Sequence, residues 1–250
     1  VDWRSKMLQL QLKRRYPTSV LITVIGLILM TMNYSCEDLM VGDWDRLDEM
    51  YADIITLTGE ASCLDSTNCR YLPLGSKPCG GPWEYLIYCS AEVDSIHLTE
   101  LVNEYNQYED ELNHKYDRSS DCSVPPEPQL GFLGGYCVDL RKPYQYEAYD
   151  SLGVLVVEGW FRIETQDSSF ISGVWDFDPV DSLENIGPQT GNGHFIGYQD
   201  KTEIRLELNP DMVDNNVSLY GTFTGTEING EWQYTGYPGL INKGSFYAEK

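Results

Sequence analysis

The chain has 250 residues and a formal net charge of −22, with 39 acidic residues against 17 Lys and Arg. So negative a surface disfavours binding to nucleic acids and to anionic lipids, because both carry charge of the same sign. Residues 1–35 hold five basic residues and one acidic residue, so the acidic excess lies in the remainder, which is long enough for two small domains.

The N-terminal segment has the pattern of a signal peptide. Basic residues precede a 13-residue apolar run from Val20 to Met32. A helix of that length rises about 20 Å, which is too short to cross a hydrocarbon core of about 30 Å. A basic start, a short apolar core and then polar residues therefore predict a signal peptide over residues 1–35, and hence export.

The apolar run is followed by Asn33-Tyr34-Ser35-Cys36, and here the sequence resembles bacterial lipoproteins. In that family a cysteine after the apolar core is acylated and becomes the first residue of the mature protein. Ser35 suits the position before the cysteine, whereas Asn33 stands where the family prefers Leu. The resemblance implies cleavage before Cys36 and a lipid anchor at the outer membrane or cell surface. An ordinary signal peptide, with a periplasmic or secreted product, is the alternative.

The remaining cysteines form an even, clustered set. They are Cys63, Cys69, Cys79, Cys89, Cys122 and Cys137. Such a set is typical of disulfides formed in an oxidising compartment. Among the possible pairs we favour Cys122 with Cys137, because the intervening VPPEP and GG segments can reverse the chain. A zinc site is disfavoured, because the sequence has no CxxC motif and its three histidines are scattered.

Residues 36–62 are predicted to form a tether passing into an amphipathic helix, because apolar residues recur there at spacings of three and four. A second amphipathic helix is predicted after Asp94 or Ser95, either of which can cap it. Its apolar face comprises Leu98, Leu101, Val102, Tyr105, Tyr108 and Leu112. Between these helices, the prolines and glycines of residues 78–82 predict a rigid turn before a short strand or buried segment at residues 83–88.

Residues 63–138 resemble an uncharacterised cysteine-containing domain of predicted bacterial lipoproteins. The resemblance rests on CGGPWEYLIY at residues 79–88, on LVNEYNQYEDELN at 101–113, and on the SDC and GGYC motifs between 120 and 137. It implies kinship but no activity. Cys89 stands where a serine is expected in that domain, so the resemblance leaves its partner the least defined.

Residues 139–152 are polar and aromatic, and they are predicted to be a linker. Residues 153–250 have the sequence pattern of short strands. For example, the apolar Ile204 and Leu206 alternate with the charged Arg205. The repeated Gly-x-Trp pattern, at residues 173–175 and 230–232, resembles strands of lipocalin-like and avidin-like barrels. The predicted fold is α+β, with an N-terminal disulfide-stapled α/β module before a C-terminal antiparallel β-barrel or β-sandwich.

Two groups of residues in the β-domain are candidate binding sites. Trp175 and Trp232 could line the mouth of a pocket, although aromatic residues in a small barrel more often fill its core. Asn209, Asp211 and Asp214 lie in one loop and offer oxygen ligands that suit calcium. The same residue types also form turns without any ion. No other cofactor is predicted.

The sequence offers no catalytic constellation. Its histidines, at positions 97, 114 and 194, are not near a nucleophile motif, and no carboxylate pair stands out. We therefore predict a non-catalytic cell-envelope lipoprotein whose β-domain binds a partner protein or an apolar small molecule. A structural, self-assembling surface subunit is the alternative, and a carboxylate-dependent hydrolase is the least favoured.

Overall fold

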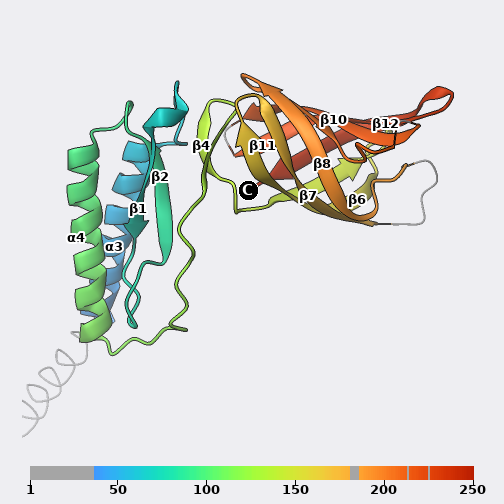
Figure 1. The fold of residues 1–250 in the computed structure, drawn as a ribbon. Coiled ribbons are helices and arrows are strands. Elements are labelled where there is room, and N and C mark those ends of the chain that lie inside the picture. Colours follow the sequence, from blue (N-terminus) through green and yellow to red (C-terminus); the bar gives the residue numbers. More distant parts are fainter. Residues whose placement is uncertain (1–36, 181–185, 213, 225) are drawn as a thin grey trace, which may run out of the picture. The chain divides into compact units, whose positions relative to one another are not determined.

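The structure is a computed structural model that describes residues 37–180, 186–212, 214–224 and 226–250 (Figure 1). The predicted signal peptide and Cys36 lie outside these residues. The chain divides into two compact units, residues 1–51 and 52–250, and helix α3 (Glu37–Thr58) runs through the boundary. Within the described ranges, no helix is both long enough and apolar enough to span a membrane.

The cysteine-containing module is built on a two-stranded antiparallel sheet. Strand β1 (Cys69–Leu74) pairs with β2 (Glu84–Cys89) along its full length. Helix α4 (Ser95–Lys115) packs against β1 and is capped by the Asp94 carboxylate, which accepts hydrogen bonds from two backbone N–H groups. The short hairpin of β3 (Leu130–Leu133) and β4 (Tyr136–Asp139) completes the module.

Three disulfides staple the module: Cys63–Cys89, Cys69–Cys137 and Cys79–Cys122. The prediction that these six cysteines form disulfides is confirmed, but the favoured Cys122–Cys137 pair is wrong. The glycines between β3 and β4 do reverse the chain, but that reversal brings Phe132, and not Cys122, opposite Cys137. The chain that leaves Cys122 runs without regular structure to residue 129, so Cys122 meets the turn after β1 while Cys137 meets β1 itself.

An eight-stranded antiparallel barrel follows, so of the two predicted architectures the barrel is confirmed. Its strands are β5 (Tyr144–Tyr149), β6 (Leu155–Asp167), β7 (Phe170–Pro179), β8 (Gly191–Asp200), β9 (Glu203–Glu207), β10 (Asn215–Thr224), β11 (Glu227–Gly236) and β12 (Gly239–Glu249). Each strand pairs with the next along the chain, and β12 pairs with β5 to close the barrel.

Strand β5 lies inside the segment that was predicted to be a linker, and that part of the prediction is wrong. Tyr144, Tyr146 and Ala148 face the interior, while Gln145 and Glu147 are exposed. The alternation did not indicate a strand in the sequence, because two of the three interior positions are tyrosines and tyrosine is also common at protein surfaces.

The barrel interior is filled with aromatic side chains. The Tyr146 and Phe177 rings stack at 4.2 Å between centroids, and Tyr144 stacks on Phe161 at 5.0 Å. Burial holds the pKa of both tyrosine hydroxyls well above the usual range, so both stay neutral. Close packing of large rings is the usual interior of an eight-stranded barrel.

Glycines on neighbouring strands make room for the two interior tryptophans. Gly244 is the cross-strand partner of Trp232, and a Cβ there would lie 2.6 Å from the Trp232 indole nitrogen. Gly193 is the partner of Trp175, and a Cβ there would lie 2.8 Å from that indole ring. Large and small residues are therefore matched across strands, and the Gly-x-Trp pattern along each strand does not by itself create the space.

Candidate functional site

Trp175 and Trp232 are core residues. They are 3% and 0% exposed, and both belong to the main hydrophobic cluster of the barrel. The Trp175 indole N–H donates to the backbone oxygen of Leu208 at 3.0 Å, and that of Trp232 donates to Tyr149 at 2.9 Å. Their polar atoms are thus satisfied within the protein, and neither ring borders the surface clefts described below.

Because the strands alternate in direction, four connections gather at one end of the barrel, which we call the loop end. Their described residues are 150–154, 180, 186–190, 208–212, 214 and 237–238. Gln189 is fully buried there, accepts a hydrogen bond from the Tyr146 hydroxyl at 3.3 Å, and donates to the backbone oxygen of Ile186 at 2.7 Å. The described residues of the β7–β8 connection thus pack onto the aromatic interior.

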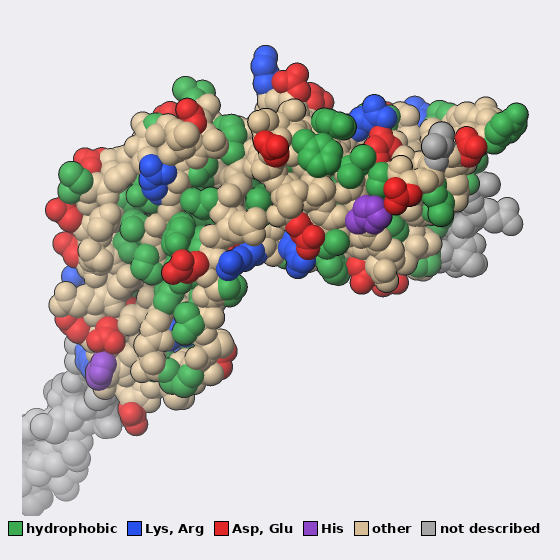
Figure 2. All heavy atoms as spheres, in the orientation of Figure 1, with side chains coloured by type: hydrophobic (Ala, Val, Ile, Leu, Met, Phe, Trp, Pro, Cys, Tyr) green, Lys and Arg blue, Asp and Glu red, His purple; other side chains and the backbone are tan. Residues whose placement is uncertain are grey.

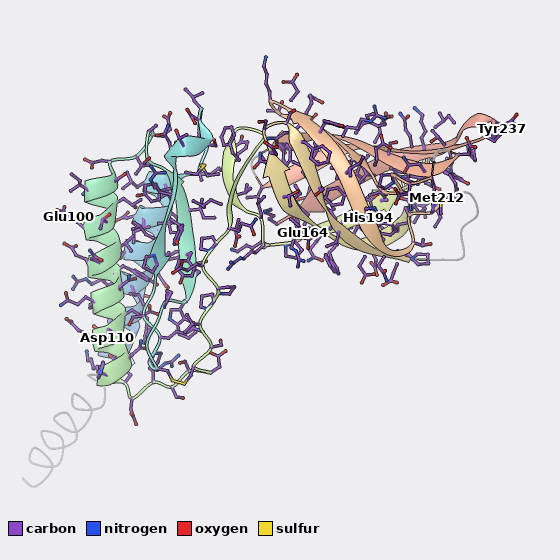
Figure 3. All side chains as sticks on the ribbon, viewed as in Figure 1. Glu100, Asp110, Glu164, His194, Met212 and Tyr237 are labelled. Carbon is purple, nitrogen blue, oxygen red and sulfur yellow. A yellow bond between two sulfur atoms is a disulfide. The ribbon has the colours of Figure 1, made fainter. Side chains whose placement is uncertain are left out.

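The loop end carries most of the exposed apolar side chains of the barrel. Among the described residues from 144 onward, nine large hydrophobic residues are exposed. Seven of them belong to the loop end and the adjoining start of β12: Leu152, Val154, Val180, Met212, Tyr237, Leu240 and Ile241. Tyr237 lies at the tip of the β11–β12 hairpin, 90% exposed, and Figure 3 places Met212 near the same end. Hydrophobic side chains are visible at this tip in Figure 2.

The predicted calcium loop lies at the same end. Asp211 and Asp214 are exposed, and the Asp211 carboxylate lies 3.4 Å from the imidazole of His194. The backbone N–H of Asn209 donates to the side chain of Asn216 at 2.9 Å, which ties the two ends of the loop together. These contacts are those of turn-forming residues, and the calcium site stays a prediction.

The two remaining exposed hydrophobic residues, Tyr198 and Tyr220, lie together on the outer face of the barrel. Tyr198 pairs across strands with Arg205, and Arg205 pairs with Tyr220. A cleft of about 540 Å³ opens beside them. It is lined by Ser169, Tyr198, Gln199, Asp200, Glu203, Ile204, Arg205 and Tyr220.

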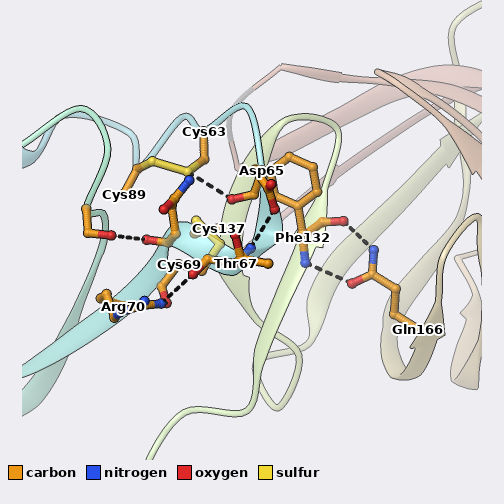
Figure 4. The surroundings of a disulfide bond; sticks show 11 residues. Cys63, Asp65, Thr67, Cys69, Arg70, Cys89, Phe132, Cys137 and Gln166 are labelled. Atoms are coloured by element: carbon orange, nitrogen blue, oxygen red, sulfur yellow. Dashed lines mark hydrogen bonds between the residues drawn. A yellow bond between two sulfur atoms is a disulfide. The ribbon is translucent and has the colours of Figure 1, made fainter.

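A second cleft, of about 330 Å³, lies beside the β3–β4 hairpin and includes Phe132, Gln166 and Gln199 in its lining. The backbone N–H of Phe132 donates to the Gln166 side chain at 2.8 Å (Figure 4), and its oxygen accepts from Gln199 at 2.9 Å. Two barrel side chains thus replace the missing strand neighbour of β3. The disulfide between Cys69 and Cys137 borders the same cleft and holds the hairpin to β1.

Three charged groups of the cysteine module have structural roles. Lys77 is only 6% exposed, contacts Asp121 at 3.1 Å, and lies over the Trp83 ring. Hydrogen bonds from Ser123 and from this lysine lower the pKa of Asp121 to about 2. Burial raises the pKa of Glu109, whose carboxylate accepts from the Trp83 indole at 2.8 Å. These bonds fix the segment around Trp83 to α4, because Glu109 belongs to that helix.

No protein-family model matches this chain, and a comparison with curated protein sequences yields no match either.

Proposed function

We propose that this protein is a non-catalytic, lipid-anchored envelope protein that binds a partner protein through the loop end of its barrel. The three disulfides support export, because such bonds persist in oxidising compartments. The lipid anchor remains the implication of the residues around Cys36. The observation that carries the binding proposal is the cluster of seven exposed apolar side chains at one end of the barrel.

The uneven distribution of these side chains supports the proposal. Scattered single apolar residues are normal on soluble proteins, whereas seven of the nine large hydrophobic residues exposed on the described part of the barrel lie at this one end. A protein partner is favoured over an apolar small molecule because the interior is occupied. A ligand inside the barrel would have to displace the stacked rings of Tyr146 and Phe177, or the fully buried Trp232.

The negative charge of the loop end favours a partner with a positively charged surface. The described residues of the four connections and their flanking strand ends include Asp150, Asp178, Asp211 and Asp214, and they include no Lys or Arg. A partner that presents apolar side chains bordered by lysine or arginine complements this surface. A second copy would bring carboxylates against carboxylates, so charge disfavours self-association through this end.

Site-specific photo-cross-linking in the native cells tests the binding proposal. A benzophenone amino acid is placed at Tyr237, and a control is placed at Glu100, which is exposed on α4 (Figure 3). We expect one discrete adduct from position 237, absent from position 100 and lost when Leu240→Ser is added. An adduct that survives Leu240→Ser, or equal cross-linking from both positions, would argue against a loop-end interface.

The anchor is tested separately by metabolic labelling with an alkyne fatty acid. We expect the wild-type chain to take up the label and Cys36→Ser to lose it. Equal labelling of the two proteins would show that Cys36 is not the lipidated residue, and it would leave the loop-end proposal standing.

A further inference from the structure

A continuous row of side chains crosses four strands on the outer face of the barrel. Phe170 on β7 pairs with Tyr198 on β8, Tyr198 with Arg205 on β9, and Arg205 with Tyr220 on β10. We call these four residues the aromatic row. Arg205 faces outward because its neighbours Ile204 and Leu206 are buried in the core.

The row is held in place by its own contacts. The Phe170 and Tyr198 rings meet edge to face at 5.5 Å, and the Arg205 guanidinium lies over Tyr220 at 5.2 Å from the ring centroid. Glu207 accepts a 2.6 Å hydrogen bond from the Arg205 Nε, which orients the guanidinium. Three strand spacings of about 4.8 Å make the row about 14 Å long. Tyr198 is nevertheless 56% exposed and Tyr220 38% exposed.

We propose that the aromatic row and its adjoining cleft bind a neutral carbohydrate chain. A pyranose ring has one face of C–H groups with partial positive charge, and these groups complement the negative face of an aromatic ring. Its hydroxyl rim needs both donors and acceptors. The cleft supplies them from side chains that are exposed, which are Ser169, Asp200, Glu203 and Arg205.

Charge at the cleft selects a neutral ligand. Asp200 and Glu203 line it and disfavour an anionic ligand such as a nucleic acid or an acidic glycan. Arg205 lies between the two tyrosines, so a cationic group stacked on either ring would face a positive charge. A molecule without net charge avoids both costs.

Size favours a carbohydrate over a protein at this position. A cleft of about 540 Å³ falls in the range of small-ligand sites, which is about 300–1,000 Å³. A stable protein interface needs about 800 Å² from each partner. In the described residues of the barrel outside the loop end and the adjoining start of β12, the exposed large hydrophobic side chains are limited to Tyr198 and Tyr220. The row is therefore independent of the loop-end proposal.

Affinity electrophoresis tests the inference. The full-length protein, in a detergent without a sugar head group, is run in native gels containing dextran, starch, a β-glucan or a galactomannan. These polymers carry no charge, so slower migration of the acidic protein reports binding. We expect at least one polymer to retard the wild type, and Tyr198→Ala with Tyr220→Ala to weaken retardation at least tenfold. Tyr237→Ala, which removes an exposed tyrosine at the loop end, should migrate as the wild type does.

Unretarded migration of the wild type in all four gels would overturn the proposal, as would retardation that persists in the double variant. A row used by a protein partner would give the first of these results. Both rings lie outside the barrel, so the variants should keep the wild-type melting temperature. If the double variant melts early, Tyr198→Ala alone, which removes the more exposed ring, must still weaken retardation.

Discussion

Replacing Trp232 by alanine separates a core role from a ligand-binding role for this residue. The side chain is fully buried, and its indole N–H donates to the Tyr149 backbone oxygen at 2.9 Å. Truncating a buried tryptophan costs about 3–5 kcal/mol, because contacts are lost and the cavity closes only in part. Loss of the hydrogen bond to this partly buried carbonyl adds about 1 kcal/mol. The expected loss of unfolding free energy is thus about 4–6 kcal/mol, a large fraction of the usual total of about 5–15 kcal/mol.

The assay is urea unfolding of the oxidised protein, followed by far-ultraviolet circular dichroism. With a denaturant slope of about 2 kcal/mol/M, the midpoint should fall by about 2–3 M. Tyr237→Ala serves as the control, because its side chain is 90% exposed and its removal should change stability by less than about 0.5 kcal/mol. A Trp232→Ala midpoint within about 0.5 M of the wild type would refute the assignment of this residue to the packed core.

Three further outcomes test other parts of the structure. Replacing Cys69 and Cys137 together by serine opens a bridge across 68 residues, and chain entropy predicts a loss of about 4 kcal/mol by urea unfolding; an unchanged midpoint would contradict this pairing. Asp121 has a pKa lowered from 3.8 to about 2, so its contribution to stability is present above pH 3.8 and lost as the pH falls through about 2. Asp121→Asn should therefore flatten the fall of the urea midpoint across this range, and an equal fall in both proteins would count against the interaction. Gly134 has a positive φ, and Gly134→Ala would put a methyl group 2.3 Å from the Cβ of the buried Phe223 on β10. It should lower the melting temperature more than Gly153→Ala, where φ is also positive but no atom lies within 4 Å, and equal losses would show that the close contact has no cost.

Local periodicity predicted much of the secondary structure. The apolar face that begins at Leu98 predicted α4. Of the two predicted cap residues, Asp94 and Ser95, the structure has Asp94 as the N-cap. Alternation around Arg205 predicted β9. Both succeed because the backbone repeats every 3.6 or every two residues, so neighbours in sequence report which side chains share a face. The same alternation did not predict β5, because its interior residues Tyr144 and Tyr146 are of a type that occurs on buried and on exposed faces.

The candidate sites depended on contacts that periodicity does not report. A Gly-x-Trp pattern was compatible with a pocket or with a core, and only the cross-strand match of Trp232 with Gly244 decided for the core. The aromatic row could not be read from the sequence, because Tyr198 and Tyr220 are 22 positions apart and meet only through the register of β9. Alternation along each strand indicates which residues face outward, but it does not indicate which outward residues of different strands are neighbours.

The sequence by itself determined that the described part of the chain has two amphipathic helices and many short strands, and that the chain has an even set of clustered cysteines and an acidic surface. These properties depend on composition and on spacings within a few residues. The tertiary structure decided that the strands close through β5 and β12, that Cys69 pairs with Cys137, and that apolar side chains gather at one end of the barrel. The physical reason is that barrel closure, disulfide pairing and a surface cluster each join residues far apart in the chain, and their geometry exists only once the strands are in register.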